Sequence, residues 1–204
     1  MQLYFSPFAC SLASRIALIE AGGGADYALV GRDKTLPGGG DFRQINSLGY
    51  VPALDIGEDE VLTEGSAILQ FIADSKPDSG LAPAWGSPER YRLQQWLSFV
   101  ATEIHAKIFA NIFDPGMPED AKTHVREKAK GRFERLSHHL ENRDFLLDQF
   151  SVADAYLVTV LNWMEYGGFD IKAWPILDAY RTGLRGRPSV AQAMAEERPL
   201  MQAA

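Results

Sequence analysis

The chain of 204 residues contains one cysteine, Cys10, at a position that favours a reactive thiol. Residues 1–5 alternate as a short strand, residues 6–9 break it, and from residue 10 onward apolar residues recur with helical spacing. Cys10 therefore lies at or beside a helix N-terminus, where unpaired N–H groups and the helix dipole favour an anion. A thiol pKa can fall there from ~8.5 to roughly 3.5–7.5. The spacing fits a small buried residue equally well, so both interpretations stay open.

The dipeptide Val51-Pro52 is a second feature that could bind a ligand. Proline cannot donate to a sheet ladder, so Pro52 belongs at the start or the edge of a strand. If the peptide bond is cis, Val51 keeps free N–H and C=O groups that can pair with an extended peptide. The alternative is an ordinary trans edge proline, which is the more frequent state.

The third feature is the stretch Glu64-Gly65-Ser66, where a strand ends and a helix begins. The N–H groups of Gly65 and Ser66 can bind a carboxylate, and Glu64 can pair with an amine. A site that holds both would bind an amino-acid head group. A capped helix start without a ligand is the alternative.

A histidine on the long helix that begins at Pro88 is the fourth feature. Ser98, Thr102 and His105 follow one another at i, i+4 and i+7, which predicts a polar stripe beside the apolar one. A lone histidine in such a place is usually structural, and a role in a site is the alternative.

Composition limits the classes of function. With 46% hydrophobic residues, the chain can bury the core of one large or two small domains. The 20 basic and 27 acidic residues give a net charge of -7, which disfavours nucleic acid and anionic membranes as partners. A lone cysteine excludes an internal disulfide and fits a reducing compartment. Neither a signal peptide nor an apolar run of ~18 residues is recognisable, so we expect a cytoplasmic protein.

The elements expected up to residue 74 alternate between strand and helix. A strand, a helix and a second strand form a crossover with parallel strands, followed by a short helix, a hairpin and a helix. The ranges are 1–5, 10–21, 27–30, 41–46, 50–56, 60–63 and 65–74. This order, βαβ-α-ββα, predicts an α/β domain.

The remainder of the chain is expected to be helical after a linker rich in proline and glycine. Ser151 and Asp154 form a capping-box pattern before a buried helix. The expected helices are one from residue 88 to an interruption at 115–118, then 119–140, 155–164, 174–184 and 189–197. We therefore predict domains at 1–76 and 88–204, joined by a linker at 77–87.

Four motifs, in this order, resemble those of the cytosolic glutathione S-transferases, in particular the bacterial beta class. The motifs are Ser6-Pro7-x-x-Cys10-Ser11, Val51-Pro52-Ala53-Leu54, Thr63-Glu64-Gly65-x-Ala67-Ile68 and Ser151-x-x-Asp154-Ala155. The likeness extends from residue 1 to about residue 188. It implies a thioredoxin-like N-terminal domain, an all-helical C-terminal domain, a homodimer, and glutathione as co-substrate without a metal.

The resemblance also implies roles for individual residues. Val51-Pro52 should be cis, and Cys10, which can form a mixed disulfide in this class, should face the glutathione sulfur. The implied catalytic residues are Cys10, Ser11 and His105. The implied glutathione-binding residues are Cys10, Lys34, Tyr50, Val51, Pro52, Glu64, Gly65, Ser66, Ser98, Thr102 and His105. The hydrophobic substrate should lie against Phe8, Phe109 and Phe113.

The sequence departs from the family pattern at several positions. Phe5 stands where relatives usually carry a tyrosine, and Tyr4 cannot replace it because neighbouring strand residues face opposite ways. Ala106 replaces a frequent lysine, Ser98 an asparagine and Arg15 a histidine. These changes leave glutathione binding expected and weaken the expectation of rapid conjugation.

The sequence thus predicts a glutathione transferase that conjugates glutathione to hydrophobic electrophiles in detoxification, with thiol transfer through Cys10 as a further activity. One alternative is a glutathione-dependent dehalogenase or reductase in which Cys10 is the nucleophile. Another is a non-catalytic ligand-binding protein with the same fold. None of these involves nucleic acid or a membrane.

Overall fold

The computed structural model describes residues 1–202, which form two compact units. Unit 1 joins Met1–Ala82 to the segment from Arg187 onward, and unit 2 spans Pro83–Gly186. From the sequence, we predicted a single C-terminal domain at residues 88–204. Packing instead assigns the last helix to unit 1, because that helix lies against the first one.

Unit 1 is built on a mixed four-stranded sheet in the order β2-β1-β3-β4. The strands are β1 (Gln2–Phe5), β2 (Asp26–Leu29), β3 (Ala53–Gly57) and β4 (Glu60–Leu62). β1 and β2 are parallel, as the crossover predicted, and β3 pairs antiparallel with both β1 and β4. This is the thioredoxin-like arrangement expected from the sequence.

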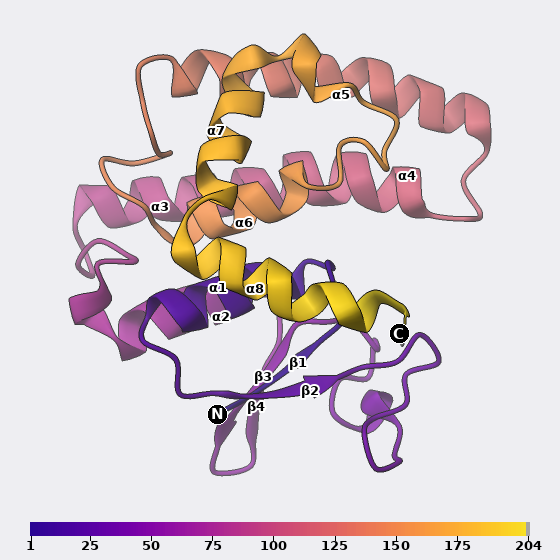
Figure 1. The fold of residues 1–204 in the computed structure, drawn as a ribbon, viewed down its shortest axis with the longest axis vertical. Helices are drawn as coiled ribbons and strands as arrows, with labels where there is room; N and C mark the ends of the chain where they lie inside the picture. Colours follow the sequence, from indigo (N-terminus) through magenta and orange to yellow (C-terminus); the bar gives the residue numbers. More distant parts are fainter. Residues whose placement is uncertain (203–204) are drawn as a thin grey trace. The chain divides into compact units, whose positions relative to one another are not determined.

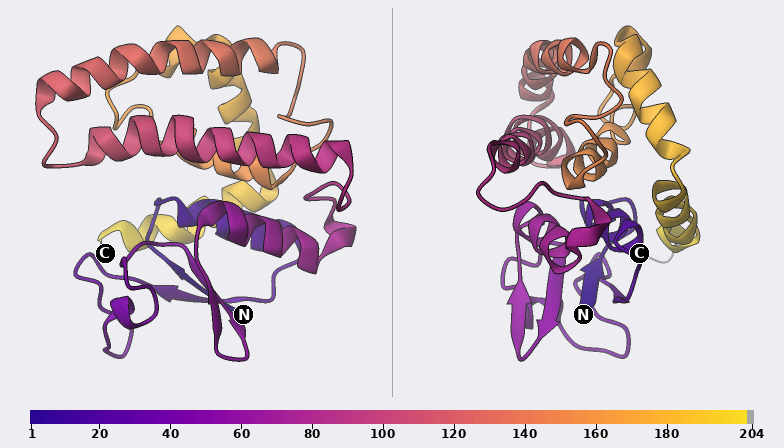
Figure 2. Two further views of the ribbon diagram at one scale, coloured as in Figure 1. Left: turned by 180° about the vertical axis from the view of Figure 1, so that it is seen from behind. Right: turned by 90° about the vertical axis from the view of Figure 1, so that its left-hand side faces the viewer.

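The helices of unit 1 place the chain turns that could bind a ligand. α1 (Ser11–Glu20) and α2 (Gly65–Ser75) lie on one face of the sheet, and α8 (Pro188–Glu197) packs against α1 (Figures 1 and 2). The short helices are η1 (Phe42–Gln44), η2 (Pro77–Ser79) and η5 (Arg198–Gln202). Cys10 directly precedes α1 and Glu64 directly precedes α2, so both helix starts lie where the sequence predicted them.

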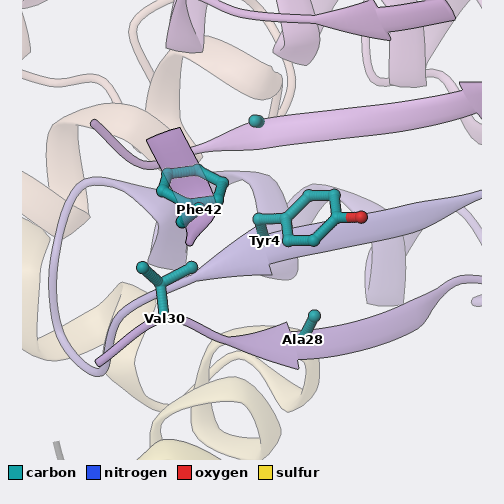
Figure 3. Close-up of a cluster of buried hydrophobic side chains, with 5 residues drawn as sticks. Tyr4, Ala28, Val30 and Phe42 are labelled. Atoms are coloured by element: carbon teal, nitrogen blue, oxygen red, sulfur yellow. The ribbon is translucent and has the colours of Figure 1, made fainter. Parts of the chain in front are cut away.

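A separate apolar cluster shows which way the first strand points its side chains. Tyr4 packs with Ala28, Val30, Phe42 and Ala53 (Figure 3). Phe5 instead forms an edge-on contact with Tyr27. Because neighbouring strand residues face opposite ways, Tyr4 cannot bring its hydroxyl to the face occupied by Phe5. This confirms the inference drawn from the alternation of the strand.

Unit 2 is entirely helical. A continuous helix comprises α3 (Pro88–Phe99), the π-helical segment η3 (Val100–Ala110) and α4 (Asn111–Phe113). α5 (Glu119–Leu140), α6 (Val152–Leu161), η4 (Ile171–Ala173) and α7 (Pro175–Arg185) complete the unit. All residues of α6 are buried, and Ser151 and Asp154 form the predicted capping box.

The π-helical segment was not apparent from the sequence, whose apolar spacing fits an ordinary α-helix. Among the described residues 1–202, no helix is both long and apolar enough to cross a membrane.

Candidate active site

Three of the four predicted motifs meet in unit 1. The Cys10 Sγ lies 3.0 Å from the Val51 carbonyl oxygen, and the Val51-Pro52 bond is cis. A Cβ added at Gly65 would lie 3.9 Å from Pro52 Cγ, so the start of α2 lies directly beside the proline. The charge of Glu64 also affects the Cys10 thiol. The starts of α1 and α2 and the segment that leads into β3 therefore lie close together around the Cys10 thiol.

The protonation of Cys10 differs from the sequence-based expectation. Burial raises the pKa of the thiol to about 11, and the negative charge of Glu64 acts in the same direction. Hydrogen bonds to the backbone N–H groups of Cys10 and Ser11 lower the pKa but do not outweigh burial. The thiol donates its proton to the Val51 carbonyl, and only the protonated form can make this bond. A helix start in partly buried surroundings therefore leaves Cys10 a neutral thiol.

The start of α2 is more open. Glu64 is exposed and has a left-handed backbone, with φ of 67°. Its carbonyl accepts hydrogen bonds from the N–H groups of Ala67 and Ile68, while its side chain does not cap the helix. The first N–H groups of a helix have no intrahelical partner. Those of Gly65 and Ser66 are thus suited to bind an anion beside a free carboxylate.

The segment that leads to Val51 is held by a residue that the sequence analysis did not single out. Asn46 is buried, and its Nδ2 donates to the Tyr50 carbonyl over 2.7 Å. Tyr50 is itself exposed. The Lys34 side chain passes beside Gly49, with its Cδ and Cε 3.5 Å from the place of an added Cβ. The Lys34 side chain therefore lies beside the segment that leads to Val51.

The Ser11 side chain makes other contacts than those expected. We expected its hydroxyl to serve the reacting groups, but this side chain is fully buried. Its Oγ donates to the Ser6 carbonyl over 3.1 Å and accepts from the Ser6 N–H over 3.2 Å. The hydroxyl therefore braces the loop before Cys10, and only the backbone N–H of Ser11 acts on the thiol.

The same loop is also held from the end of the chain. Phe8 has a left-handed φ of 56°, and its N–H donates to Glu197 Oε2 over 2.7 Å. Glu197 is fully buried, and burial raises its pKa to about 7. Arg15 stacks over the Phe5 and Tyr27 rings and pairs with Glu196. No sequence signal connects Phe8 to a residue 189 positions away.

In unit 2, His105 lies in an aromatic environment. Its Nδ1 is 2.7 Å from the Tyr156 hydroxyl, and its ring meets that of Trp163 edge-on, with centroids 5.0 Å apart. Burial lowers the pKa of His105. Ser98 and Thr102 are exposed on the same helix, where Thr102 donates to the Ser98 carbonyl. The half-buried ring of His105 therefore packs against Tyr156 and Trp163, whereas Ser98 and Thr102 are exposed.

Of the three phenylalanines predicted to contact a hydrophobic substrate, Phe109 and Phe113 lie in unit 2 and differ in exposure. Phe109 is fully buried, and its ring packs edge-on against Trp163 and Phe169. Phe113 stacks on Phe109 and is 45% exposed. Phe113 therefore presents apolar surface, while Phe109 supports it from behind.

A thioredoxin-like unit with a cysteine beside a cis-proline, joined to a helical unit, defines the class of cytosolic glutathione S-transferases. Residues 99–188 match the family described as "Glutathione S-transferase, C-terminal domain". The chain is 38% identical over 201 residues to glutathione S-transferase GstA of Escherichia coli O157:H7, covering 97% of this chain and 98% of that protein.

Solved structures agree with this comparison. BphK, a bacterial glutathione S-transferase solved as a ternary complex, has a TM-score of 0.93 at 43% identity, covering 97% of this chain and 99% of the other. A sphingomonad glutathione S-transferase complexed with glutathione has a TM-score of 0.92 at 43% identity over 97% and 98%. The bacterial beta-class glutathione S-transferase of Sphingomonas chungbukensis has a TM-score of 0.93 at 42% identity, covering 97% of this chain and 99% of the other. The chain therefore belongs to the glutathione S-transferase family and resembles its bacterial beta class.

Proposed function

We propose that this glutathione transferase binds glutathione in unit 1 and conjugates it to hydrophobic electrophiles. The observation that supports this proposal is that Cys10, Val51 and Gly65 lie close together in unit 1. The Val51 backbone would pair with the cysteinyl part of the tripeptide. The N–H groups of Gly65 and Ser66 would bind the γ-glutamyl carboxylate, and Glu64 its amino group.

The state of Cys10 favours conjugation over thiol transfer as the main reaction. With a pKa of about 11, the thiol is protonated near neutral pH and is a poor nucleophile. It can still donate a hydrogen bond to the anionic sulfur of glutathione, and a bond to an ionised acceptor is a strong one. Pairing of the tripeptide N–H with the Val51 carbonyl would release the Cys10 proton for this purpose. Thiol transfer requires removal of that proton and is a secondary activity.

The remaining predicted residues fit supporting roles. Lys34, with Tyr50 and Pro52 nearby, would contact the rest of the tripeptide, including its glycine carboxylate. In unit 2, His105 would assist the sulfur, with Ser98 and Thr102 beside it on the helix. The exposed ring of Phe113 suits an apolar substrate, and we assign Phe8 to the same role.

We further propose a cytoplasmic homodimer. The family resemblance implies that the α2 helix of one subunit packs against the helices of residues 88–140 in the other. Closed two-fold dimers are also the commonest assembly and cover apolar surface. Sedimentation should give twice the mass of one chain. A monomer at all concentrations would contradict this assembly.

Turnover of a chlorinated nitroaromatic by the parent, Cys10→Ala and Cys10→Ser proteins tests the proposed chemistry. Conjugation should persist in both variants. Cys10→Ala loses one hydrogen-bond donor, worth about 1–3 kcal/mol, and should be slower by about 5- to 150-fold, whereas Cys10→Ser keeps a hydroxyl donor and should be slowed less. Complete loss would instead assign Cys10 as the nucleophile of a dehalogenase or reductase. Glutathione binding without any turnover would identify a carrier.

A further inference from the structure

Tyr156 contacts the side chain of His105 in the structure. Its hydroxyl lies 2.7 Å from His105 Nδ1, and the two rings are edge-on with centroids 6.0 Å apart. The edge-on ring of Trp163 confines the imidazole further. His105 thus has its Nδ1 committed to a contact inside unit 2.

The element that carries Tyr156 is rigid. Tyr156 is 5% exposed on α6, where every residue is buried. The helix start is fixed by Asp154, which accepts hydrogen bonds from Ser151 and from the Tyr180 hydroxyl. The phenol therefore stands at a fixed position against the histidine, as a group that orients another must.

The chemistry of the two partners indicates which of them donates. Burial lowers the pKa of His105, so the ring is neutral near neutral pH and carries one proton. The unprotonated nitrogen of a neutral imidazole is a stronger acceptor than a phenol oxygen, and a phenol keeps its proton up to a pH of about 10. The favoured arrangement is donation from the Tyr156 hydroxyl to Nδ1. The bond at one ring nitrogen sets the state of the other, so the proton of the ring is on Nε2.

We propose that Tyr156 is a positioning residue which holds His105 in the Nε2–H tautomer and thereby makes it a hydrogen-bond donor instead of a base. The inference rests on the proposed role of His105 in conjugation. A neutral N–H donor stabilises the anionic sulfur of glutathione but does not accept the proton that the thiol loses, and this proton leaves to solvent water. Tyr156 acts only through His105.

Nitrogen NMR of the parent protein tests the tautomer directly. The chain has four histidines, and the His105→Gln variant identifies the His105 signals by their absence. The parent should show a protonated Nε2 and an unprotonated Nδ1 near pH 7. An Nδ1–H tautomer of His105 in the parent would overturn the proposal.

The variant Tyr156→Phe tests the consequence for turnover. Its kcat for conjugation should fall about three- to tenfold with little change in KM for glutathione, since one positioned hydrogen bond is lost. The His105 signals should shift to a mixture of both tautomers. The matched control is Tyr166→Phe, because Tyr166 lies in the same unit and is 77% exposed. It should behave as the parent does.

A double-mutant cycle separates positioning from a merely structural effect. In the His105→Gln background, Tyr156→Phe should cost no further turnover, because glutamine needs no tautomer control. The same loss in both backgrounds would show that Tyr156 acts only on stability and would overturn the proposal. If His105→Ala retains full turnover, the proposed role of His105 itself fails. If His105→Ala loses turnover while Tyr156→Phe retains it, only the present inference fails.

Discussion

The two helix starts of unit 1 have the same backbone chemistry and different surroundings. At α1 the first turn is buried, and the pKa of Cys10 is raised to about 11. At α2 the preceding residue, Glu64, is exposed, and Gly65 and Ser66 are half-buried. Both starts offer unpaired N–H groups and a positive dipole end.

The difference shows that a helix N-terminus does not by itself ionise a thiol. The dipole contributes typically about 0.3–1 kcal/mol, whereas desolvation can shift a pKa by several units. Burial therefore dominates at α1, where it leaves Cys10 a hydrogen-bond donor. The open start of α2 is the better place for a ligand carboxylate.

The largest expected effect is that replacement of Cys10 abolishes mixed-disulfide formation with glutathione. The parent incubated with oxidised glutathione should form one mixed disulfide per chain, faster as the pH rises from about 7 to 9, because only the thiolate attacks. Cys10→Ala should form none and should still bind glutathione, since the contacts assigned to Val51, Glu64, Gly65 and Ser66 need no thiol. Mass spectrometry and calorimetry check both results. An unmodified parent with intact Cys10 would count against any thiol transfer.

The second effect concerns the buried carboxylate of Glu197, which accepts a hydrogen bond from Phe8 in the loop before α1. The pKa of Glu197 is raised from 4.5 to about 7, so the folded state binds this proton more tightly than the unfolded state. Its contribution to stability is present at low pH and is lost as the pH rises from 4.5 to about 7. The difference amounts to at most about 3 kcal/mol at 1.36 kcal/mol per pKa unit.

Glu197→Gln should remove this dependence while it keeps an acceptor for the Phe8 N–H. Denaturant unfolding at about pH 5 and pH 8 would show the variant gaining stability relative to the parent at the higher pH. A constant difference between the two proteins would mean that Glu197 stays charged throughout.

The third effect compares two buried serines of α1. Ser11→Ala removes both hydrogen bonds to the Ser6 backbone and should lower the free energy of unfolding by about 1–3 kcal/mol. The control is Ser14→Ala, because the Ser14 hydroxyl is equally buried and has no hydrogen-bond partner among residues 1–202. It should be neutral or stabilising. Equal losses in the two variants would contradict the bracing role of Ser11.

The smallest effect on stability is expected at α2, where the change should appear in binding alone. Glu64→Gln removes the charge opposite the ligand amino group, a contact worth roughly 1.5–3 kcal/mol, so glutathione affinity should fall about tenfold or more. The free energy of unfolding should change by only a few tenths of a kcal/mol, because Glu64 is exposed and does not cap the helix. Unchanged affinity in a folded variant would reduce Glu64 to a helix-end residue.

Much of the fold could be predicted because its signals are local. The bounds of α5, the capping box of α6 and the parallel pairing of β1 with β2 follow from helical spacing, Ser151 with Asp154, and the crossover rule. These features depend on local signals and on elements that follow one another in the sequence. Cys10, Val51 and Gly65 are farther apart in the sequence, and it was the family resemblance of their motifs that assigned them to one site.

The rest depends on partners that are distant in the sequence. Glu197 reaches Phe8 across 189 positions, and Tyr156 reaches His105 across 51. The pKa of Cys10 depends on how far the folded chain desolvates it, which spacing does not reveal. For the same reason the helical pattern of α8 gave no sign that it packs with unit 1.

The rate of Cys10 alkylation by iodoacetamide as a function of pH tests the central claim most directly. Cys10 is the only cysteine of the chain, so mass spectrometry reports this one thiol. With a pKa of about 11, the rate should rise about tenfold per pH unit and show no plateau up to a pH of about 10. A plateau near pH 7 or below would show an ionised thiol at the start of α1 and would contradict the account of Cys10 as a donor.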